Sequence, residues 1–199
     1  MILLCLASNS YKLRYLSCIK SQENYCYRYK CTYRLISGAD SEKNWKRAKI
    51  EEIEYLLENT EEDICLIDAD CYIKDTCPPM NFTHTEKSIY YVNGKSGRLN
   101  SGFLYFKNND QTKKFIKDLK EKLKKNIPRG KGYFVTAEGE NGHIIWLQDE
   151  YKQNGIDIFH ALPVLWNCTS PKLENEAYVL HFTNDLKKRF NYYNNVSNN

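Results

Sequence analysis

The sequence has little of what marks a membrane, fibrous or zinc-binding protein. No apolar run approaches the roughly 18 residues that cross a bilayer, and 9 glycines and 5 prolines in 199 residues are too few for a fibrous or low-complexity chain. The 8 cysteines form no Cys-x-x-Cys pair, and only 4 histidines are present, so we do not expect a zinc site. A formal charge of +4 is too small to indicate a nucleic-acid partner.

The first residues, MILLCLAS, have no basic start and only about seven apolar residues, which does not fit a signal peptide. We expect a buried strand from Ile2 to Ala7 instead. With no signal peptide or membrane anchor, a cytoplasmic protein with reduced cysteines is expected, in a microbe or in the cytoplasm of a virus-infected host. Glycosylation sequons at Asn81, Asn167 and Asn195 would then carry no glycan.

Strand and helix patterns alternate along the chain, which predicts an α/β domain over residues 1–190 followed by a polar tail at 191–199. Strands are predicted at 2–7, 31–36, 64–67, 88–92, 103–106, 156–159 and 178–182, and helices at 8–29, from Ser41 to about Leu57, at 111–125 and at 143–154. We expect a mostly parallel sheet flanked by helices, with ligands beyond the carboxyl ends of its strands.

Two aspartates, Asp68 and Asp70, follow the apolar run Ile64 to Ile67. Two carboxylates this close repel each other and are costly to bury without a counter-charge. A divalent cation such as Mg²⁺ or Mn²⁺ is the simplest remedy, because both accept oxygen ligands and bind substrate phosphates. The alternative is a solvated loop, since Asp-x-Asp alone is a common pattern.

Four segments, in order, resemble motifs of the nucleotide-sugar-dependent glycosyltransferases of the GT-A type. LIDADCYI is similar to their Asp-x-Asp segment, and LNSGFLYFKN at 99–108 is similar to the strand that contacts the donor sugar. DEYKQN at 149–154 resembles the Asp-Glu-x-x-Leu-Asn helix of blood-group-type enzymes. HFTNDLK at 181–187 resembles the His-Phe-x-Gly-x-x-Lys segment of glycogenin-like enzymes, with Asn184 where glycine is usual. The Tyr-rich stretch NYCYRYKCTYRL also resembles yeast and plant α-galactosyl and xylosyltransferases.

This resemblance implies a GT-A, Rossmann-like mixed sheet and a role for each motif residue. It implies that Asp70 and His181 bind the metal, Mn²⁺ or Mg²⁺, of which the imidazole suits Mn²⁺ better, and that Asp68 binds the metal or the ribose. The donor-binding residues implied are Asp68, Asn100, Ser101, Gly102, Lys187, Lys49 and Ala7.

Each of these roles has a plainer alternative. His181 could be a core histidine, and Asn100 could belong to a simple turn. Lys187 could lie in a solvated basic run, and Lys49 could be an exposed helix charge.

Asp149 and Glu150 are the catalytic candidates that the resemblance implies. Retention of anomeric configuration could use Glu150 as a nucleophile or attack on the face that the diphosphate leaves. Inversion would use either carboxylate as a general base. Solvated helix charges are the plain alternative for both residues.

The resulting hypothesis is a metal-dependent, retaining glycosyltransferase that moves a sugar from a UDP-sugar to a glycan or another hydroxyl acceptor. A catalytically silent nucleotide-sugar or carbohydrate-binding module of the same fold is the alternative. A nucleotidyltransferase is disfavoured because the first loop, ASNSYKLR, has no glycine, and the P-loop motif is absent.

The acceptor is expected at the loops 126–142 and 160–176. Aromatic residues in or near these loops could stack on sugar rings (Tyr133, Phe134, Trp146 and Trp166), with core packing as the alternative for both tryptophans. A basic segment could approach a phosphorylated or membrane acceptor, or could simply be solvated (Lys124, Lys125, Arg129 and Lys131).

Overall fold

The computed structural model describes residues 1–39, 44–82, 85–128 and 140–196. The chain begins with strand β1 (Ile2–Ser8), which is buried along almost its whole length. Parallel strands lie on both sides of β1, namely β2 (Thr32–Gly38) and β3 (Ile64–Ile67). A strand that is covered on both faces needs apolar side chains at every position, and this explains the continuous runs ILLCLA and ICLI.

The main sheet has six strands in the order β2-β1-β3-β6-β5-β7. Strand β6 (Leu99–Phe106) runs antiparallel to β3, and β5 (Ile89–Asn93) runs antiparallel to β6. Strand β7 (Phe159–Leu162) is parallel to β5. Three pairings are therefore parallel and two antiparallel, which confirms the predicted mixed, mostly parallel sheet with flanking helices.

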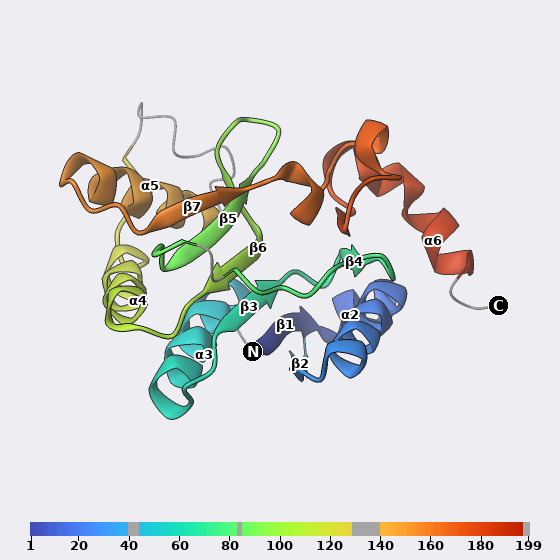
Figure 1. Cartoon of the computed structure of the whole chain (residues 1–199), viewed down its shortest axis with the longest axis horizontal. Helices are drawn as coiled ribbons and strands as arrows, with labels where there is room; N and C mark the ends of the chain where they lie inside the picture. Colours follow the sequence, from blue (N-terminus) through green and yellow to red (C-terminus); the bar gives the residue numbers. More distant parts are fainter. Residues whose placement is uncertain (40–43, 83–84, 129–139, 197–199) are drawn as a thin grey trace.

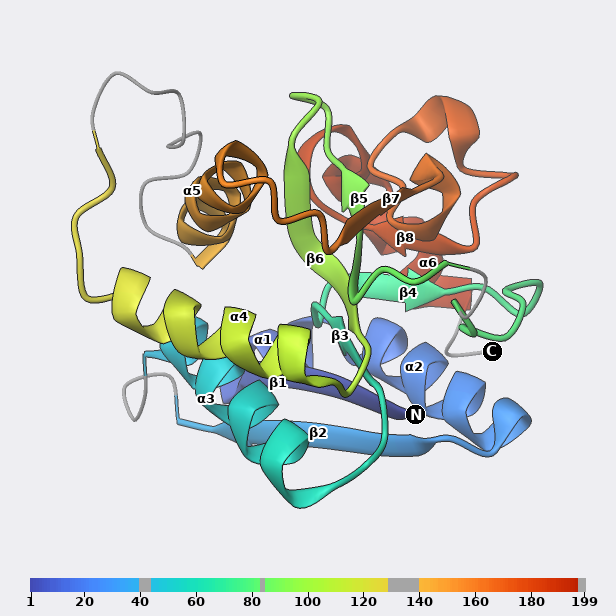
Figure 2. The same ribbon diagram turned by 60° about the vertical axis from the view of Figure 1, so that its left-hand side comes forward.

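Helices cover both faces of this sheet (Figures 1 and 2). Alternate residues of β1 face opposite layers. Ile2, Leu4 and Leu6 pack in the cluster that includes α3 (Trp45–Asn59), α4 (Asp110–Lys122) and α5 (Glu140–Gln153). Leu3 and Cys5 pack in the cluster that includes α2 (Leu16–Tyr29) and a second, two-stranded sheet of β4 (Cys71–Ile73) and β8 (Val179–His181).

Short elements complete the fold. Helix α1 (Asn9–Arg14) directly follows β1, and three 3₁₀ helices flank β8, namely η1 (Val164–Trp166), η2 (Pro171–Leu173) and η3 (Asn184–Arg189). The expected polar tail is helical up to residue 196, as α6 (Phe190–Val196). It is held because Phe190 and Tyr193 pack against Phe182, with ring centroids 5.1 and 5.3 Å from the Phe182 ring.

Other elements also differ from the sequence prediction: β6 begins at Leu99 rather than at 103, β4 was not predicted, and the predicted helix 8–29 is divided into α1 and α2. Helix α5 begins at Glu140 rather than at residue 143, and β7 lies at 159–162 rather than at 156–159. Within the described ranges, no helix is long and apolar enough to cross a membrane. The predicted start of the α3 helix at Ser41 lies outside the described residues.

Candidate active site

The polar side chains meet at the edge of the main sheet where β1 and β3 end. Because β6 is antiparallel to β3, the first residues of β6 lie at the same edge as the last residues of β3. The backbone N–H of Asp68 donates to the carbonyl of Gly102 at 3.0 Å, which joins the Asp-x-Asp loop to β6. The topology therefore brings together two motifs that lie more than thirty residues apart in the sequence.

Helix α2 holds the Asp-x-Asp loop in place through side-chain hydrogen bonds. The Gln22 side chain is fully buried, and its Nε2 donates to the carbonyls of Asp68 at 3.0 Å and Cys71 at 2.9 Å. The adjacent Ser21 hydroxyl accepts the Ile73 N–H at 2.9 Å. These bonds satisfy backbone groups that the short strand β4 would otherwise leave unpaired.

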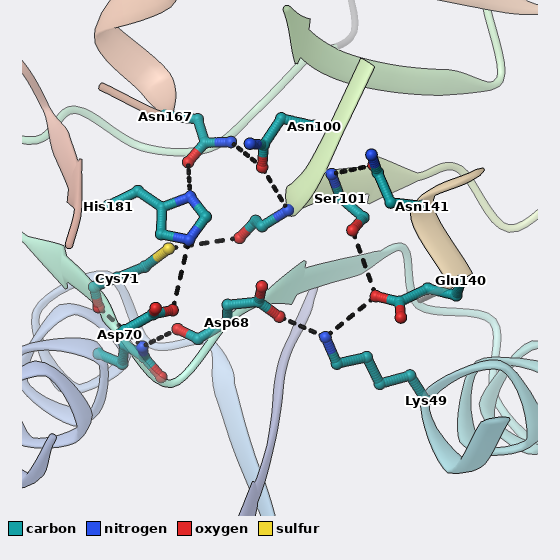
Figure 3. Close-up of polar contacts among 12 residues, drawn as sticks. Lys49, Asp68, Asp70, Cys71, Asn100, Ser101, Glu140, Asn141, Asn167 and His181 are labelled. Carbon is teal, nitrogen blue, oxygen red and sulfur yellow. Dashed lines mark hydrogen bonds and ion pairs between the residues drawn. The ribbon is translucent and has the colours of Figure 1, made fainter. Parts of the chain in front are cut away.

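Asp70 and His181 face each other because β4 and β8 pair in register at Cys71 and His181. His181 Nε2 lies 3.4 Å from Asp70 Oδ1, and both side chains are nearly buried (Figure 3). Burial alone would raise the pKa of Asp70, but the charge and hydrogen bond of His181 outweigh it and hold that pKa below its usual value. Burial acts to lower the pKa of His181, but the charge and hydrogen bond of Asp70 outweigh it and raise that pKa above its ordinary value.

Lys49 of α3 lies between two carboxylates on the other side of the loop. Its Nζ is 2.5 Å from Asp68 Oδ1 and 3.2 Å from Glu140 Oε1. Burial acts to lower the Lys49 pKa, but these two charges outweigh it and raise the pKa above its ordinary value. Burial raises the pKa of Asp68, and the Asp70 charge adds to this effect against the pull of Lys49.

Strand β6 bulges at the site. Tyr91 of β5 pairs with Leu104, yet the next residue, Val92, pairs with Asn100. Bulges re-aim side chains and are common beside active sites. Here Ser101 donates its hydroxyl proton to Glu140 at 3.2 Å, and its backbone N–H donates to Asn141 Oδ1 at 2.9 Å.

The imidazole of His181 lies against Gly102 and is held by an amide. A Cβ atom at Gly102 would come within 2.3 Å of His181 Cε1, so only glycine fits here. His181 Nδ1 lies 3.0 Å from Asn167 Oδ1, and Asn167 Nδ2 donates to Asn100 Oδ1 at 3.0 Å (Figure 3).

These residues fit a divalent cation of the Mn²⁺ or Mg²⁺ kind. Ligand atoms of Asp70, Cys71 and His181 all lie within 4.8 Å of one another. Burial raises the pKa of the Cys71 thiol well above its usual value, and the thiol donates to the Gly102 carbonyl at 3.4 Å, so Cys71 is a poor ligand. Three carboxylates and one lysine leave an excess of negative charge in a buried cluster, which a divalent cation would neutralise.

Not every predicted site residue lies at this cluster. Lys49, Asp68, Asp70, Asn100, Ser101, Gly102 and His181 do. Ala7 is buried near the end of β1, and Lys187 is exposed on η3, six residues after His181.

The two carboxylates expected to be catalytic lie elsewhere on α5. Glu150 pairs with Lys122 of α4 at 2.6 Å. Both Asp149 and Glu150 follow Glu140 by about three helical turns, or roughly 15 Å along α5. The structure therefore brings Glu140, and not Asp149 or Glu150, to the Asp-x-Asp loop.

Four residues at or near the site escaped the sequence analysis, namely Tyr11, Glu140, Asn141 and Asn167. A possible signal for two of them was the acid-amide pair Glu140-Asn141 directly before the apolar run of α5. Tyr11 lies on α1, which directly follows the end of β1, and burial and then the Asp70 charge raise the pKa of its hydroxyl to about 12. Asn167 follows an ordinary core tryptophan and carried no signal.

The expected acceptor residues are only partly described. Tyr133, Phe134, Arg129 and Lys131 lie outside the described residues. Trp166 is a core residue, with its ring edge-on to Phe82 at 5.0 Å, as the plainer alternative predicted. Trp146 is partly buried, with Lys122 Nζ 3.9 Å from its ring centroid.

Neither a protein-family model nor a curated protein sequence matches this chain. Solved structures do. The chain is similar to a glycosyltransferase involved in glycosylation of the major capsid of PBCV-1, with a TM-score of 0.68 and 14% identity over 97% of this chain and 98% of that one. The chain has the GT-A fold.

Two other GT-A structures are similar over nearly the whole of this chain. The galactosyltransferase LgtC, solved with donor and acceptor sugar analogues, gives a TM-score of 0.60 and 11% identity over 97% of this chain and 95% of that one. GlyE of Streptococcus pneumoniae gives 0.60 and 13% over 96% of this chain, which spans only 59% of GlyE. At these identities the likeness establishes the GT-A fold.

Proposed function

We propose that this protein is a metal-dependent glycosyltransferase that transfers a sugar from a nucleoside-diphosphate donor, a UDP-sugar, to a hydroxyl acceptor such as a glycan. The observation that carries the proposal is the buried pair of Asp70 and His181, 3.4 Å apart, at the sheet edge where the GT-A fold places ligands. Neighbours of the same fold that are glycosyltransferases support it.

In this proposal Asp70 and His181 hold the cation, and Asp68 completes the site or binds the ribose. When bound, the cation would stabilise the negative charge of the departing diphosphate. Lys49 pairs with both Asp68 and Glu140 and so fixes the two side chains in place. Tyr11, 44% exposed on α1, offers a ring for stacking beside the nucleotide.

Asn100, Ser101 and Glu140 would face the donor sugar. Glu140 is ionised, since burial opposes its charge but Lys49 outweighs that and holds its pKa below the usual value. The ion pair with Lys49 lowers the basicity of Glu140 and so makes this carboxylate a weaker nucleophile. We therefore propose retention by attack on the face that the diphosphate leaves, without a glycosyl-enzyme intermediate.

The first test is a calorimetric titration of UDP with and without Mn²⁺, followed by a panel of UDP- and GDP-sugars. We expect UDP to bind only with the metal, and Asp70→Asn and His181→Gln to abolish this binding. Asp75→Asn is the matched control, because the Asp75 side chain is 94% exposed and lies away from the cluster. Metal-independent binding, or full binding by Asp70→Asn, would refute the proposed site.

Two further results test the class of donor and the route of retention. A preference for GDP-sugars would refute the UDP-sugar donor. A glycosyl-enzyme adduct on Glu140, detected by mass spectrometry of the donor-treated protein, would refute the proposed route of retention. Tight donor binding with no transfer to any hydroxyl acceptor would favour the silent binding module.

A further inference from the structure

The proton position on His181 is determined by a chain of hydrogen bonds that begins at a backbone amide. The N–H of Gly102 donates to Asn100 Oδ1 at 2.8 Å. A backbone N–H is always a donor, so the atom that faces it must be the side-chain oxygen of Asn100 and not its nitrogen. This fixes the orientation of the Asn100 amide.

The orientation of Asn100 then fixes that of Asn167. Asn100 Oδ1 also lies 3.0 Å from the Asn167 side chain, and an oxygen can face only the NH₂ group there. The oxygen of Asn167 therefore points the other way, toward His181 Nδ1 at 3.0 Å. A flipped Asn167 would put two oxygens together at one end and two nitrogens at the other.

Facing an amide oxygen, Nδ1 of His181 must carry a hydrogen. The charged ring donates from both nitrogens, to Asn167 and to Asp70; the neutral ring in this form keeps a lone pair on Nε2, which faces Asp70 Oδ1 at 3.4 Å. Two electron-rich atoms thus face each other across a gap in which a cation can bind both. Asn167 is 2% exposed, so water does not compete for this bond.

We infer that Asn167 is a positioning residue: with Asn100 and the Gly102 N–H, it holds the neutral His181 ring in the Nδ1–H form and so prepares Nε2 to bind a divalent cation. The inference rests on the proposed function for its metal. Partners that orient a ligating histidine typically change metal affinity about 10- to 100-fold when removed.

The test combines ring NMR of metal-free protein with Mn²⁺ titration. Long-range ¹H–¹⁵N spectra at alkaline pH report which ring nitrogen carries the hydrogen, and His181→Asn assigns the His181 signals. We expect wild type to show the Nδ1–H form. Asn167→Leu should show a mixture of both forms and bind Mn²⁺ about 10- to 100-fold more weakly.

Two further variants separate positioning from folding. Asn167→Asp keeps an oxygen opposite Nδ1 but sets its second oxygen against Asn100 Oδ1, so it should retain the Nδ1–H form while it loses the bond to Asn100. Asn108→Leu is the control, because Asn108 also links two segments, by donating to the Thr60 carbonyl at 2.7 Å, but lies outside the cluster. It should lower stability and leave both readouts unchanged.

The outcomes distinguish this inference from the function on which it rests. A folded Asn167→Leu variant with the pure Nδ1–H form and wild-type Mn²⁺ affinity would overturn the inference. A wild-type protein with the Nδ1–H form that binds no Mn²⁺ would refute the metal-dependent function and support the assignment of the ring proton.

Discussion

Lys49 Nζ lies 2.5 Å from Asp68 Oδ1, so a lysine of α3 neutralises the first aspartate of the Asp-x-Asp loop. The same ammonium reaches Glu140 of α5, and the Lys49 side chain is 13% exposed. One positive charge thus joins a helix that precedes β3 to a helix that follows β6. The ion pairs of the candidate site therefore also hold α3 and α5 against the Asp-x-Asp loop.

Replacing Lys49 by Met should therefore destabilise the protein as well as the site. It leaves the buried carboxylate of Glu140 and the partly buried one of Asp68 without their counter-charge, and loss of a buried partner typically costs about 3 to 5 kcal/mol. Chemical denaturation measures this loss. The control is Arg47→Met on the same helix, where an exposed i,i+4 pair with Glu51 should cost about 0.3 to 0.5 kcal/mol. Equal losses in the two variants would contradict the assigned role.

Gly102→Ala should weaken metal binding while the fold persists. The new methyl group would overlap the His181 ring, 2.3 Å from Cε1, and push the imidazole away from Asp70. We expect the Mn²⁺ affinity measured by calorimetry to fall at least about 10-fold. Gly94→Ala is the matched control in the same hairpin, because its Cβ would meet nothing nearer than 3.5 Å. Unchanged affinity in Gly102→Ala would show that His181 is not a ligand.

Gln22→Leu should weaken the attachment of the Asp-x-Asp loop to α2. The carbonyls of Asp68 and Cys71 would lose their side-chain donor, and the free energy of unfolding should fall by about 1 to 3 kcal/mol. Mn²⁺ affinity should fall with it, because the loop is no longer held. Gln153→Leu, at an exposed position near the end of α5, should change neither quantity. A stable Gln22→Leu variant with weaker Mn²⁺ binding would confine its role to the site.

Asn184 stands where the similar glycogenin-like motif has a glycine, and the stability of variants at this position tests its backbone conformation. Its φ is 49°, in the left-handed region, which asparagine tolerates better than other side chains. We expect Asn184→Gly to leave thermal stability nearly unchanged and Asn184→Val to cost about 1 to 2 kcal/mol. If both variants are equally stable, the backbone after β8 does not adopt this conformation.

The central strands could be predicted from the sequence because burial on both faces demands an unbroken apolar run. The Asp-x-Asp loop could be predicted for the complementary reason, since two carboxylates after such a run need a partner. Each of these inferences needs only local pattern and burial.

The α5 residues show where such reasoning ends. Glycines at 139 and 142 favoured a loop, so the predicted helix began three residues after Glu140. Asp149 and Glu150 matched a motif in residue type, but residue type does not determine which turn of the helix faces the site. Asn167 reaches His181 only through the pairing of distant segments, which no local pattern encodes.

The bulge in β6 separates the pairing of this strand with β3 from the side chains that it presents to the cluster. The pairing of Phe103 with Ile67 continues on the β3 side, while β5 passes over residues 101–103 without pairing to them. Substitution at Ser101 can therefore change what the cluster recognises with little effect on the ladder that joins β6 to β3. Such a segment can change its side chains while packing holds the sheet around it in place.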